Sequence, residues 1–220
     1  MTSRNLLLWG ATGHARVLNE LAQRLGWRVI LLVDNRAVSA PWAGVELVIG
    51  VDALDAWLEA RERAEPLHGA VAVGGNRGSD RMELLELLAA RNVLLPALVH
   101  PTAFVALDAI IGHGCQVLAN ASVCSHARLG RGVIVNTAAS VDPDTQLGDG
   151  VHIGPGAHLA GEVTVGPRAF VGAGAVVLPQ MTIGADAVIG AGAVVTKNVP
   201  ARVVVIGNPA RITGVGDAKR

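Results

Sequence analysis

An aliphatic side chain recurs at every sixth position between residues 105 and 195. A period of six does not fit an α-helix, because six residues advance by ~600° and scatter the side chains around the cylinder. It is typical of a hexapeptide β-helix, in which short strands form three flat walls around stacked aliphatic side chains. The positions of this register are Val105, Ile111, Val117, Val123, Leu129, Val135, Val141, Leu147, Ile153, Leu159, Val165, Val171, Val177, Ile183, Ile189 and Val195.

A second, longer period of glycine residues supports the prediction of a β-helix. Glycine recurs every eighteen residues, at Gly112, Gly130, Gly148, Gly166 and Gly184. Three hexads would therefore make one turn of the helix, and glycine would open its corners by allowing unusual φ angles. Successive turns would then pair as parallel strands ~4.8 Å apart.

Before the repeat, short apolar runs alternate with amphipathic stretches. This order predicts a small α/β domain with a parallel sheet. His100-Pro101 marks the change of period, so we expect an α/β domain over residues 1–98 and a β-helix domain with a short tail over residues 99–220. The expected strands are Leu6–Trp9, Arg28–Val33, Val45–Ile49, Ala70–Val73 and Val93–Leu95, and the expected helices are Ala15–Leu25, Asp52–Arg63 and Asp80–Arg91.

Two glycine-bearing turns follow expected strands of the α/β domain. Gly10–His14 stands between a strand and a helix, and Asp34 lies about twenty positions further on, which is the layout of a nucleotide site. The turn lacks a full G-x-G-x-x-G, so a tight turn without a ligand is the alternative. Gly74–Arg77 is the second such turn. Ligands bind at the carboxyl ends of parallel strands, so the two turns together predict a ligand site.

Composition excludes several classes of function. The formal net charge is +0 and there is no tyrosine, which argues against a protein that binds nucleic acid. No apolar run is long enough to span a membrane, and no signal-peptide pattern is present, so a cytoplasmic protein is expected. The two cysteines, Cys115 and Cys124, are expected to be reduced.

Three features together resemble one family. They are the turn Gly10–His14, the His100-Pro101 junction, and a hexad repeat that is followed by Gly207-Asn-Pro-Ala-Arg211. In combination they are similar to the sugar acyltransferases of the PglD/NeuD type, which are hexapeptide-repeat enzymes. The resemblance implies a left-handed β-helix, a homotrimer with active sites between subunits, acetyl-CoA as co-substrate and a UDP-linked sugar as acceptor.

The resemblance also implies roles for individual residues. Positions that hold the nucleotide-sugar are matched by Gly13, His14, Asp34, Asn76 and Arg77. The sugar side of the acyl-transfer site would include Asn136 and Asp144, whereas His152 and the backbone N–H of Gly161 would face the acetyl group. The coenzyme would be bound by Gly172, Gly174, Gly190 and Arg211.

One position departs from the family pattern. Pro143 stands between Asp142 and Asp144, where the family has its general-base histidine. One hypothesis is base-free N-acetylation, because a sugar amine with a pKa of ~8 is partly neutral near physiological pH. A second is O-acetylation with the base moved to His126, which would lie in one column between Asp108 and Asp144. A third is a non-catalytic protein that binds nucleotide-sugars.

Zinc is not expected. Trimeric β-helix enzymes that bind zinc use three histidines, two of which are five residues apart. His152 and His158 are six residues apart, and His113 and His126 are thirteen apart. Hexad position decides which wall carries a side chain, so these spacings do not reproduce a zinc site.

Overall fold

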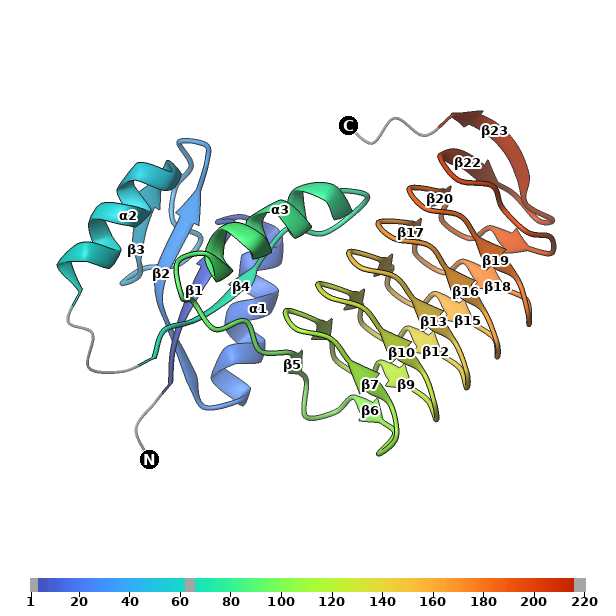
Figure 1. Ribbon diagram of the computed structural model, residues 1–220, viewed down its shortest axis with the longest axis horizontal. Helices are drawn as coiled ribbons and strands as arrows, with labels where there is room; N and C mark the ends of the chain where they lie inside the picture. The colour runs from blue at the N-terminus through green and yellow to red at the C-terminus, as the bar shows by residue number, and fades with distance from the viewer. Residues whose placement is uncertain (1–3, 62–65, 216–220) are drawn as a thin grey trace. The chain divides into compact units, whose positions relative to one another are not determined.

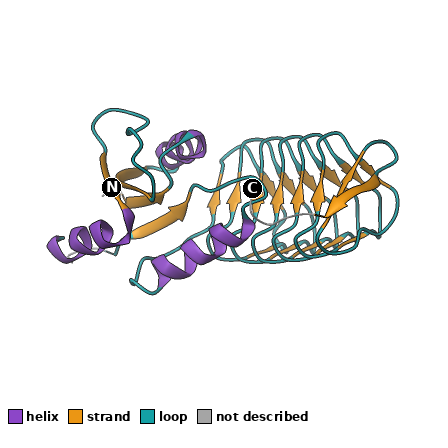
Figure 2. Cartoon of the chain, turned by 90° about the horizontal axis from the view of Figure 1, so that it is seen from above, coloured by secondary structure: helices purple, strands orange, loops and turns teal. Residues whose placement is uncertain are grey.

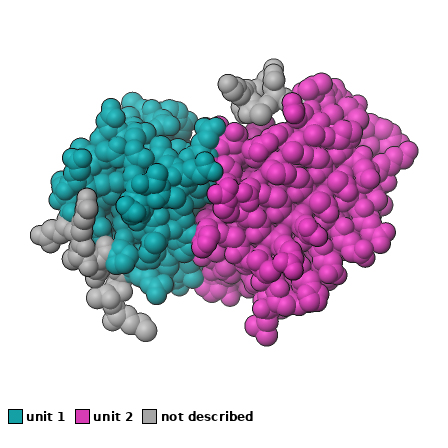
Figure 3. Space-filling model, viewed as in Figure 1, with its two compact units in different colours: residues 1–73, 83–96 teal, residues 74–82, 97–220 magenta. Residues whose placement is uncertain are grey.

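The computed structural model describes residues 4–61 and 66–215 of the 220-residue chain. By its internal contacts the chain divides into two units (Figures 1 and 3). The first unit comprises residues 1–73 and 83–96, and the second comprises residues 74–82 and 97–220. The boundary expected between residues 98 and 99 concerns independently folding domains and stays a prediction.

The first unit contains a parallel sheet with the strand order β3-β2-β1-β4. The parallel sheet expected for this part of the chain is thereby confirmed. Its strands are β1 (Arg4–Trp9), β2 (Trp27–Asp34), β3 (Glu46–Ile49) and β4 (His68–Val71). The helices of this part of the chain are α1 (Gly13–Arg24), α2 (Gly50–Ala60) and α3 (Gly78–Ala89), of which α3 begins in the second unit and ends in the first. Leucines of the two central strands are fully buried: Leu6, Leu7, Leu8, Leu31 and Leu32.

Gly10 brings three strand ends together. Its N–H donates to Val33 O at 2.6 Å, and the N–H of Ala72 donates to Trp9 O at 2.6 Å. The φ of Gly10 is +112°, and a Cβ at this position would lie 2.7 Å from Ala72 O. Any larger residue would therefore both strain the backbone and separate β1 from the end of β4.

The predicted elements differ from the structure mainly at their ends, since β4 and all three helices begin two residues earlier than predicted. The strand predicted at Val93–Leu95 was wrong, because Leu94 forms only an isolated parallel bridge with His68. Pro96 follows directly and has no N–H with which to extend the pairing. Helix α2 begins at Gly50, two residues before its prediction, while residues 62 and 63 of that prediction lie outside the described residues.

The second unit is a parallel β-helix with three walls, visible as rows of short strands in Figure 2. The first wall contains β5 (Leu98–Val99), β8 (Gln116–Val117), β11 (Ile134–Val135), β14 (His152–Ile153), β17 (Phe170–Val171), β20 (Val188–Ile189) and β22 (Val203–Ile206). The second wall contains β6 (Phe104–Val105), β9 (Ser122–Val123), β12 (Ser140–Val141), β15 (His158–Leu159), β18 (Val176–Val177) and β21 (Val194–Val195). The third wall contains β7 (Ile110–Ile111), β10 (Arg128–Leu129), β13 (Gln146–Leu147), β16 (Thr164–Val165) and β19 (Thr182–Ile183).

The pairing register confirms the eighteen-residue turn. Val135 pairs with Val117 on one side and with Ile153 on the other, so each aliphatic position stacks on the position eighteen residues away. These three side chains are fully buried, as the hexad pattern predicts. Two-residue corners join the walls, and the second corner residue often has a positive φ, as at Asp144 and Glu162.

The tail after the repeat is more regular than the sequence indicated. Strand β22 continues the first wall beyond β20, and β23 (Arg211–Val215) pairs with it in antiparallel orientation. The Gly207-Asn-Pro-Ala segment forms the turn between the two strands. The hairpin therefore ends the stack of parallel strands.

Within residues 4–61 and 66–215, no helix is both long and apolar enough to cross a bilayer.

Candidate active site

The Gly10–His14 turn joins the carboxyl end of β1 to α1. The helix begins at Gly13, and Thr12 before it has an extended backbone and makes no side-chain cap. The first turn of α1 carries no acidic side chain. This helix start is therefore electrostatically suited to an anion, as expected for a phosphate of a nucleotide.

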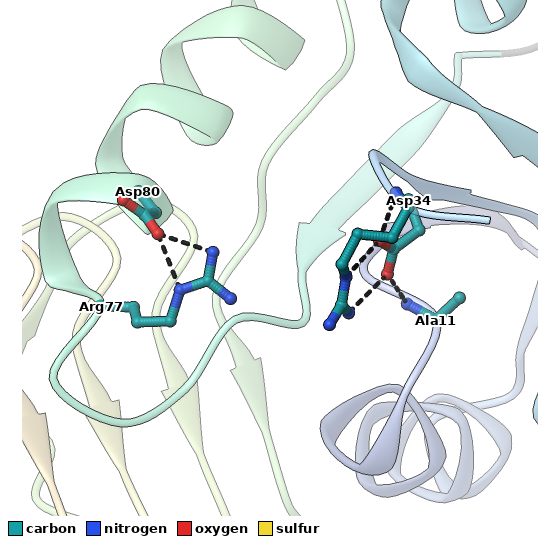
Figure 4. Close-up of polar contacts among 5 residues, drawn as sticks. Ala11, Asp34, Arg77 and Asp80 are labelled. Carbon is teal, nitrogen blue, oxygen red and sulfur yellow. Dashed lines mark hydrogen bonds and ion pairs between the residues drawn. The ribbon is translucent and has the colours of Figure 1, made fainter. Parts of the chain in front are cut away.

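Asp34, at the end of β2, is held by donors of its own unit (Figure 4). Its Oδ2 accepts from the Ala11 N–H at 3.0 Å, and its Oδ1 accepts from the Arg36 N–H at 3.0 Å. The Arg36 guanidinium adds bonds of 3.1 and 3.2 Å. Burial alone would raise the pKa of Asp34, but the hydrogen bonds from Arg36 and Ala11 outweigh it and lower the pKa. Asp34 thus fastens β2 to the Gly10–His14 turn as a carboxylate.

Sequence reasoning singled out Asp34 and missed Arg36. The Arg36 side chain is 62% exposed although it is paired with the almost buried Asp34. A basic residue two positions after the acidic one was the available signal, since arginine forms bidentate pairs with carboxylates.

The second glycine turn belongs, by its contacts, to the unit of the β-helix. We call Gly74–Met82 the covering segment. Asn76 is half-buried and Arg77 is exposed in it. Arg77 forms an ion pair with Asp80 in the first turn of α3, with an Nη2–Oδ2 distance of 2.6 Å (Figure 4). The structure therefore assigns Asn76 and Arg77 to a different unit from Gly13, His14 and Asp34.

His152 and Asn136 meet on the outer face of the first wall. His152 is 5% exposed, and its Nδ1 accepts a hydrogen bond of 2.8 Å from the Gly75 N–H. Its Nε2 lies 3.1 Å from Asn136 Nδ2, while Asn136 Oδ1 accepts from the Thr137 N–H at 2.8 Å. The ring of Phe170 contacts His152 edge-on, with 5.3 Å between centroids. The imidazole is thus fixed by the covering segment and by two side chains of its own wall.

The corner between the second and third walls carries the other predicted catalytic residues. His126, Asp144 and Gly161 lie there on successive turns of the helix. His126 is 68% exposed, and its Nδ1 lies 3.4 Å from Asp108 Oδ2. Pro143 occupies the same corner, where its carbonyl accepts from the Glu162 N–H at 2.9 Å. His126 therefore lies beside Asp108 at this corner, and the catalytic roles of His126, Asp144 and Gly161 stay predictions.

The two sets of residues lie on opposite sides of the β-helix. Each turn has three walls, so the corner between the second and third walls lies opposite the first wall. His152 and Asn136 point outward from the first wall, whereas Asp144 and Gly161 stand at the opposite corner. Within one chain, His152 and Asn136 lie together on the first wall, and Asp144 and Gly161 lie together at the opposite corner. The first pair does not meet the second pair in the same chain.

The predicted coenzyme residues fall into two kinds. A Cβ at Gly172 would lie 2.6 Å from Ala191 N, and a Cβ at Gly190 would lie 2.6 Å from Ile206 Cγ2. These two glycines are required by the stacking of successive turns. Gly174 has a φ of +65° and open space beside it. Arg211 lines an open cavity of about 350 Å³ with Lys197, Asn198, Val199, Pro200, Val205, Ala210 and Ile212.

The remaining histidines and the two cysteines, all within the described residues, form no group that could hold a metal ion. His158 Nδ1 lies 3.0 Å from Ser140 Oγ on the exposed second wall. Both cysteines are free thiols, and burial raises the pKa of Cys115 to about 11. Among the residues that the structure describes, no group of three or more His, Cys, Asp or Glu side chains is arranged to hold a metal ion.

Comparison with known proteins assigns the family. Residues 5–84 match the PglD N-terminal domain, and residues 144–179 match the bacterial transferase hexapeptide (six repeats). No curated protein sequence gives a significant match. Perosamine N-acetyltransferase from Caulobacter crescentus, as a histidine-to-asparagine variant in complex with CoA and GDP-perosamine, has 36% identity and a TM-score of 0.88, covering 96% of this chain and 97% of its own.

A second solved structure gives the same result. The acetyltransferase domain of PglB from Neisseria gonorrhoeae, in complex with acetyl coenzyme A, has 38% identity and a TM-score of 0.86, covering 96% of this chain and 100% of its own. WeeI from Acinetobacter baumannii has 25% identity and a TM-score of 0.82 over 96% of this chain. These matches confirm the predicted α/β domain followed by a left-handed parallel β-helix. The chain belongs to the hexapeptide-repeat sugar acyltransferases that carry a PglD-type N-terminal domain.

Proposed function

We propose that the protein transfers an acetyl group from acetyl-CoA to the amine of a nucleotide-linked amino sugar. The observation that carries this proposal is Pro143 at the corner that also holds Asp144 and Gly161. Proline has no ionisable group, so it cannot accept a proton from the acceptor. An acceptor that needs no base is therefore favoured.

An amine acceptor and a hydroxyl acceptor differ in their need for a general base. A hydroxyl is barely ionised near neutral pH and needs a general base to become a good nucleophile. An amine next to electron-withdrawing carbons resembles an α-amino group, with a pKa of ~8. An appreciable fraction of it is already neutral, and correct orientation beside the thioester then supplies much of the rate acceleration.

The proposed step forms a C–N bond, breaks the C–S bond of the thioester and releases one proton. The amine nitrogen attacks the thioester carbonyl, and the Gly161 N–H stabilises the oxyanion that develops. Collapse of the intermediate breaks the C–S bond, so CoA leaves as a thiolate while the nitrogen loses its extra proton to solvent. His152, fixed by Gly75 and Asn136, orients the acetyl group.

A homotrimer would complete this site. His152 and Gly161 lie on opposite sides of one β-helix, so a site that uses both needs two chains. In the proposed head-to-tail ring of three chains, the corner of one chain would lie against the first wall of the next. The same arrangement would bring Asn136 and Asp144 to one sugar.

The two substrates are proposed by analogy with relatives. One relative is described in complex with CoA and GDP-perosamine, and another in complex with acetyl coenzyme A. We propose that Gly13, His14 and Asp34 of the first unit bind the nucleotide-sugar. The role of Asn76 and Arg77 of the covering segment in substrate binding is a prediction from the family resemblance. Gly174 and Arg211, with the close-packed Gly172 and Gly190 on neighbouring turns, would lie along the coenzyme. The predicted nucleotide is UDP, and GDP is the alternative because the Caulobacter crescentus relative is described with GDP-perosamine.

A second candidate is O-acetylation with His126 as the base. It is supported by the exposure of His126 and by the 3.4 Å distance between its Nδ1 and Asp108 Oδ2, one turn away from Pro143 at the same corner. A carboxylate at this distance can orient the imidazole ring.

Acetyl transfer to UDP- and GDP-linked amino sugars, measured against pH, tests both candidates. We expect the wild-type rate to rise through the pKa of the acceptor amine and to survive His126→Ala. Loss of activity in His126→Ala, but not in His113→Ala, would assign the base to His126. Robust acetylation of a sugar that has no amine, or no turnover with any of these acceptors, would contradict N-acetylation.

A further inference from the structure

Arg81 is a fully buried arginine outside the residues assigned to the reaction so far. It lies in the second turn of α3, within the covering segment, and is 0% exposed. Burial lowers the pKa of Arg81 to about 10, so the side chain remains positively charged near neutral pH. A charge is buried at high cost in free energy unless it is hydrogen-bonded.

The partners of Arg81 are backbone carbonyls of the β-helix. Its Nε donates to Gly132 O at 2.7 Å, and its Nη2 donates to Gly150 O at 2.5 Å and to Val151 O at 3.3 Å. Gly132 and Gly150 end the corners that lead into β11 and β14 on two successive turns. One side chain therefore joins the covering segment to the two strands that precede Asn136 and carry His152.

Close backbone packing also holds the covering segment against the β-helix. A Cβ at Gly78, the first residue of α3, would lie 2.6 Å from Gly150 O and 2.9 Å from Arg168 Cα. A Cβ at Gly150 would in turn lie 3.0 Å from Met82 Cγ. The start of α3 thus contacts the corner at Gly150 with no room for displacement.

The covering segment connects this contact to His152. Only Asn76 and Arg77 separate Gly75 from Gly78 in the chain. The Gly75 N–H donates to His152 Nδ1 at 2.8 Å, so anchoring of α3 fixes the position of this donor. Asn76 and Arg77, which the family resemblance predicts to contact the nucleotide-sugar, lie between the two fixed points.

We propose that Arg81 is a positioning residue for acyl transfer, holding the covering segment on the first wall so that Gly75 orients His152 while Asn76 and Arg77 are presented to the nucleotide-sugar. The expected effect of Arg81 on catalysis rests on the proposed function. The expected effect of Arg81 on the positions of Gly75 and His152 does not rest on it.

Arg81→Met tests the proposal in the full-length protein. Methionine fills similar space but leaves the carbonyls of Gly132 and Gly150 without their donor. A displacement of ~1 Å at a positioning residue can reduce activity ~100-fold, and we expect a loss of this size in kcat/KM for the nucleotide-sugar. The KM for acetyl-CoA should not change. Arg81→Lys, which keeps the charge, should recover part of the activity.

Two measurements on the unliganded protein separate positioning from general destabilisation. Hydrogen–deuterium exchange should become faster in residues 74–82 of Arg81→Met, while the β-helix strands remain protected. The ring ¹⁵N resonances of His152, which distinguish an accepting nitrogen from a protonated one, should change. Gly78→Ala should reproduce both effects with Arg81 intact, whereas Arg24→Met and Gly214→Ala are matched surface controls without effect.

The outcomes are distinguishable. Unchanged exchange in residues 74–82 and unchanged His152 resonances in Arg81→Met would overturn the proposal. Uniformly faster exchange throughout the β-helix would also overturn it, since Arg81 would then be only a structural residue. Absence of turnover in the wild type would refute the proposed function, but the exchange and resonance measurements would still decide the role of Arg81.

Discussion

Pro143, Gly161 and Pro179 occupy the same corner position on three successive turns of the β-helix. The residue that follows each of them has a positive φ, between 61° and 63°. Type II turns have this geometry, and they favour proline at the position before the residue with positive φ. Proline is therefore compatible with the backbone at this corner, whether or not the chemistry requires a histidine there.

Proline occupies this corner position on the neighbouring turns. The Gly161 N–H, which is the proposed oxyanion donor, can therefore be removed without changing the turn. Gly161→Pro deletes the backbone N–H but inserts a residue that the neighbouring turns already hold. Removal of one oxyanion donor typically costs roughly 100-fold or more in kcat, and we expect a loss of this order. Gly161→Ala is the control, because it keeps the N–H and its Cβ would lie 3.4 Å from Pro143 O. Equal activity of the two variants would exclude the donor role.

Pro143→His would introduce the residue type that the family resemblance predicts for this corner. A positioned general base contributes ~100-fold or more to proton-dependent steps. We therefore expect the variant to acetylate a hydroxyl acceptor and to retain N-acetylation at lower pH than the wild type. Pro143→Ala, which lacks the imidazole, should show neither gain. Rate–pH profiles with amino and hydroxy acceptors measure this, and identical profiles for the two variants would contradict it.

Among whole elements, the β-helix strands were the most predictable. Each strand stacks on the strand eighteen residues away, so every turn imposes the same inward position on the sequence, as Val117, Val135 and Ile153 show. The pattern is then repeated often enough to exclude chance. The strand expected at Val93–Leu95 lacked such repetition, and apolar residues that pack without forming a ladder give the same signal.

The start of β4 contains a histidine whose charge should affect stability. His68 packs against Trp27 with 5.0 Å between ring centroids, and its buried Nδ1 has no hydrogen-bond partner among the described residues. Burial, and then the nearby positive charge of Arg4, lower the pKa of His68. The unfolded chain therefore binds the proton more tightly than the folded one below the ordinary histidine pKa of ~6.5.

We expect the first unit to lose stability as the pH falls below ~6.5, and His68→Leu to remove this part of the pH dependence. All four tryptophans, Trp9, Trp27, Trp42 and Trp57, lie in residues 1–73, so urea unfolding followed by tryptophan fluorescence reports on this unit. His158→Gln, at an exposed site, is the control and should behave as the wild type. Parallel stability–pH curves for the wild type and His68→Leu would show that His68 does not contribute.

For the whole molecule, the hexad period predicted the wall or corner that carries each residue of the β-helix. The family resemblance assigned Asn136, Asp144, His152 and Gly161 to one site between subunits. The eighteen-residue turn places them on opposite sides of one chain. The burial of Arg81 was not predictable from the sequence, because a charged residue on a helix is usually exposed. This burial depends on contacts with two turns of the β-helix, which no local pattern contains.

This separation makes a quantitative prediction for mixed oligomers. His152→Asn and Gly161→Pro should each be strongly impaired alone. If each site takes His152 from one chain and Gly161 from the next in a head-to-tail ring, equal random mixing leaves about one quarter of the sites with both native residues. Co-expressed or refolded mixtures should therefore regain about a quarter of the wild-type activity. A site within a single chain would regain none, because every chain in the mixture carries one of the two substitutions.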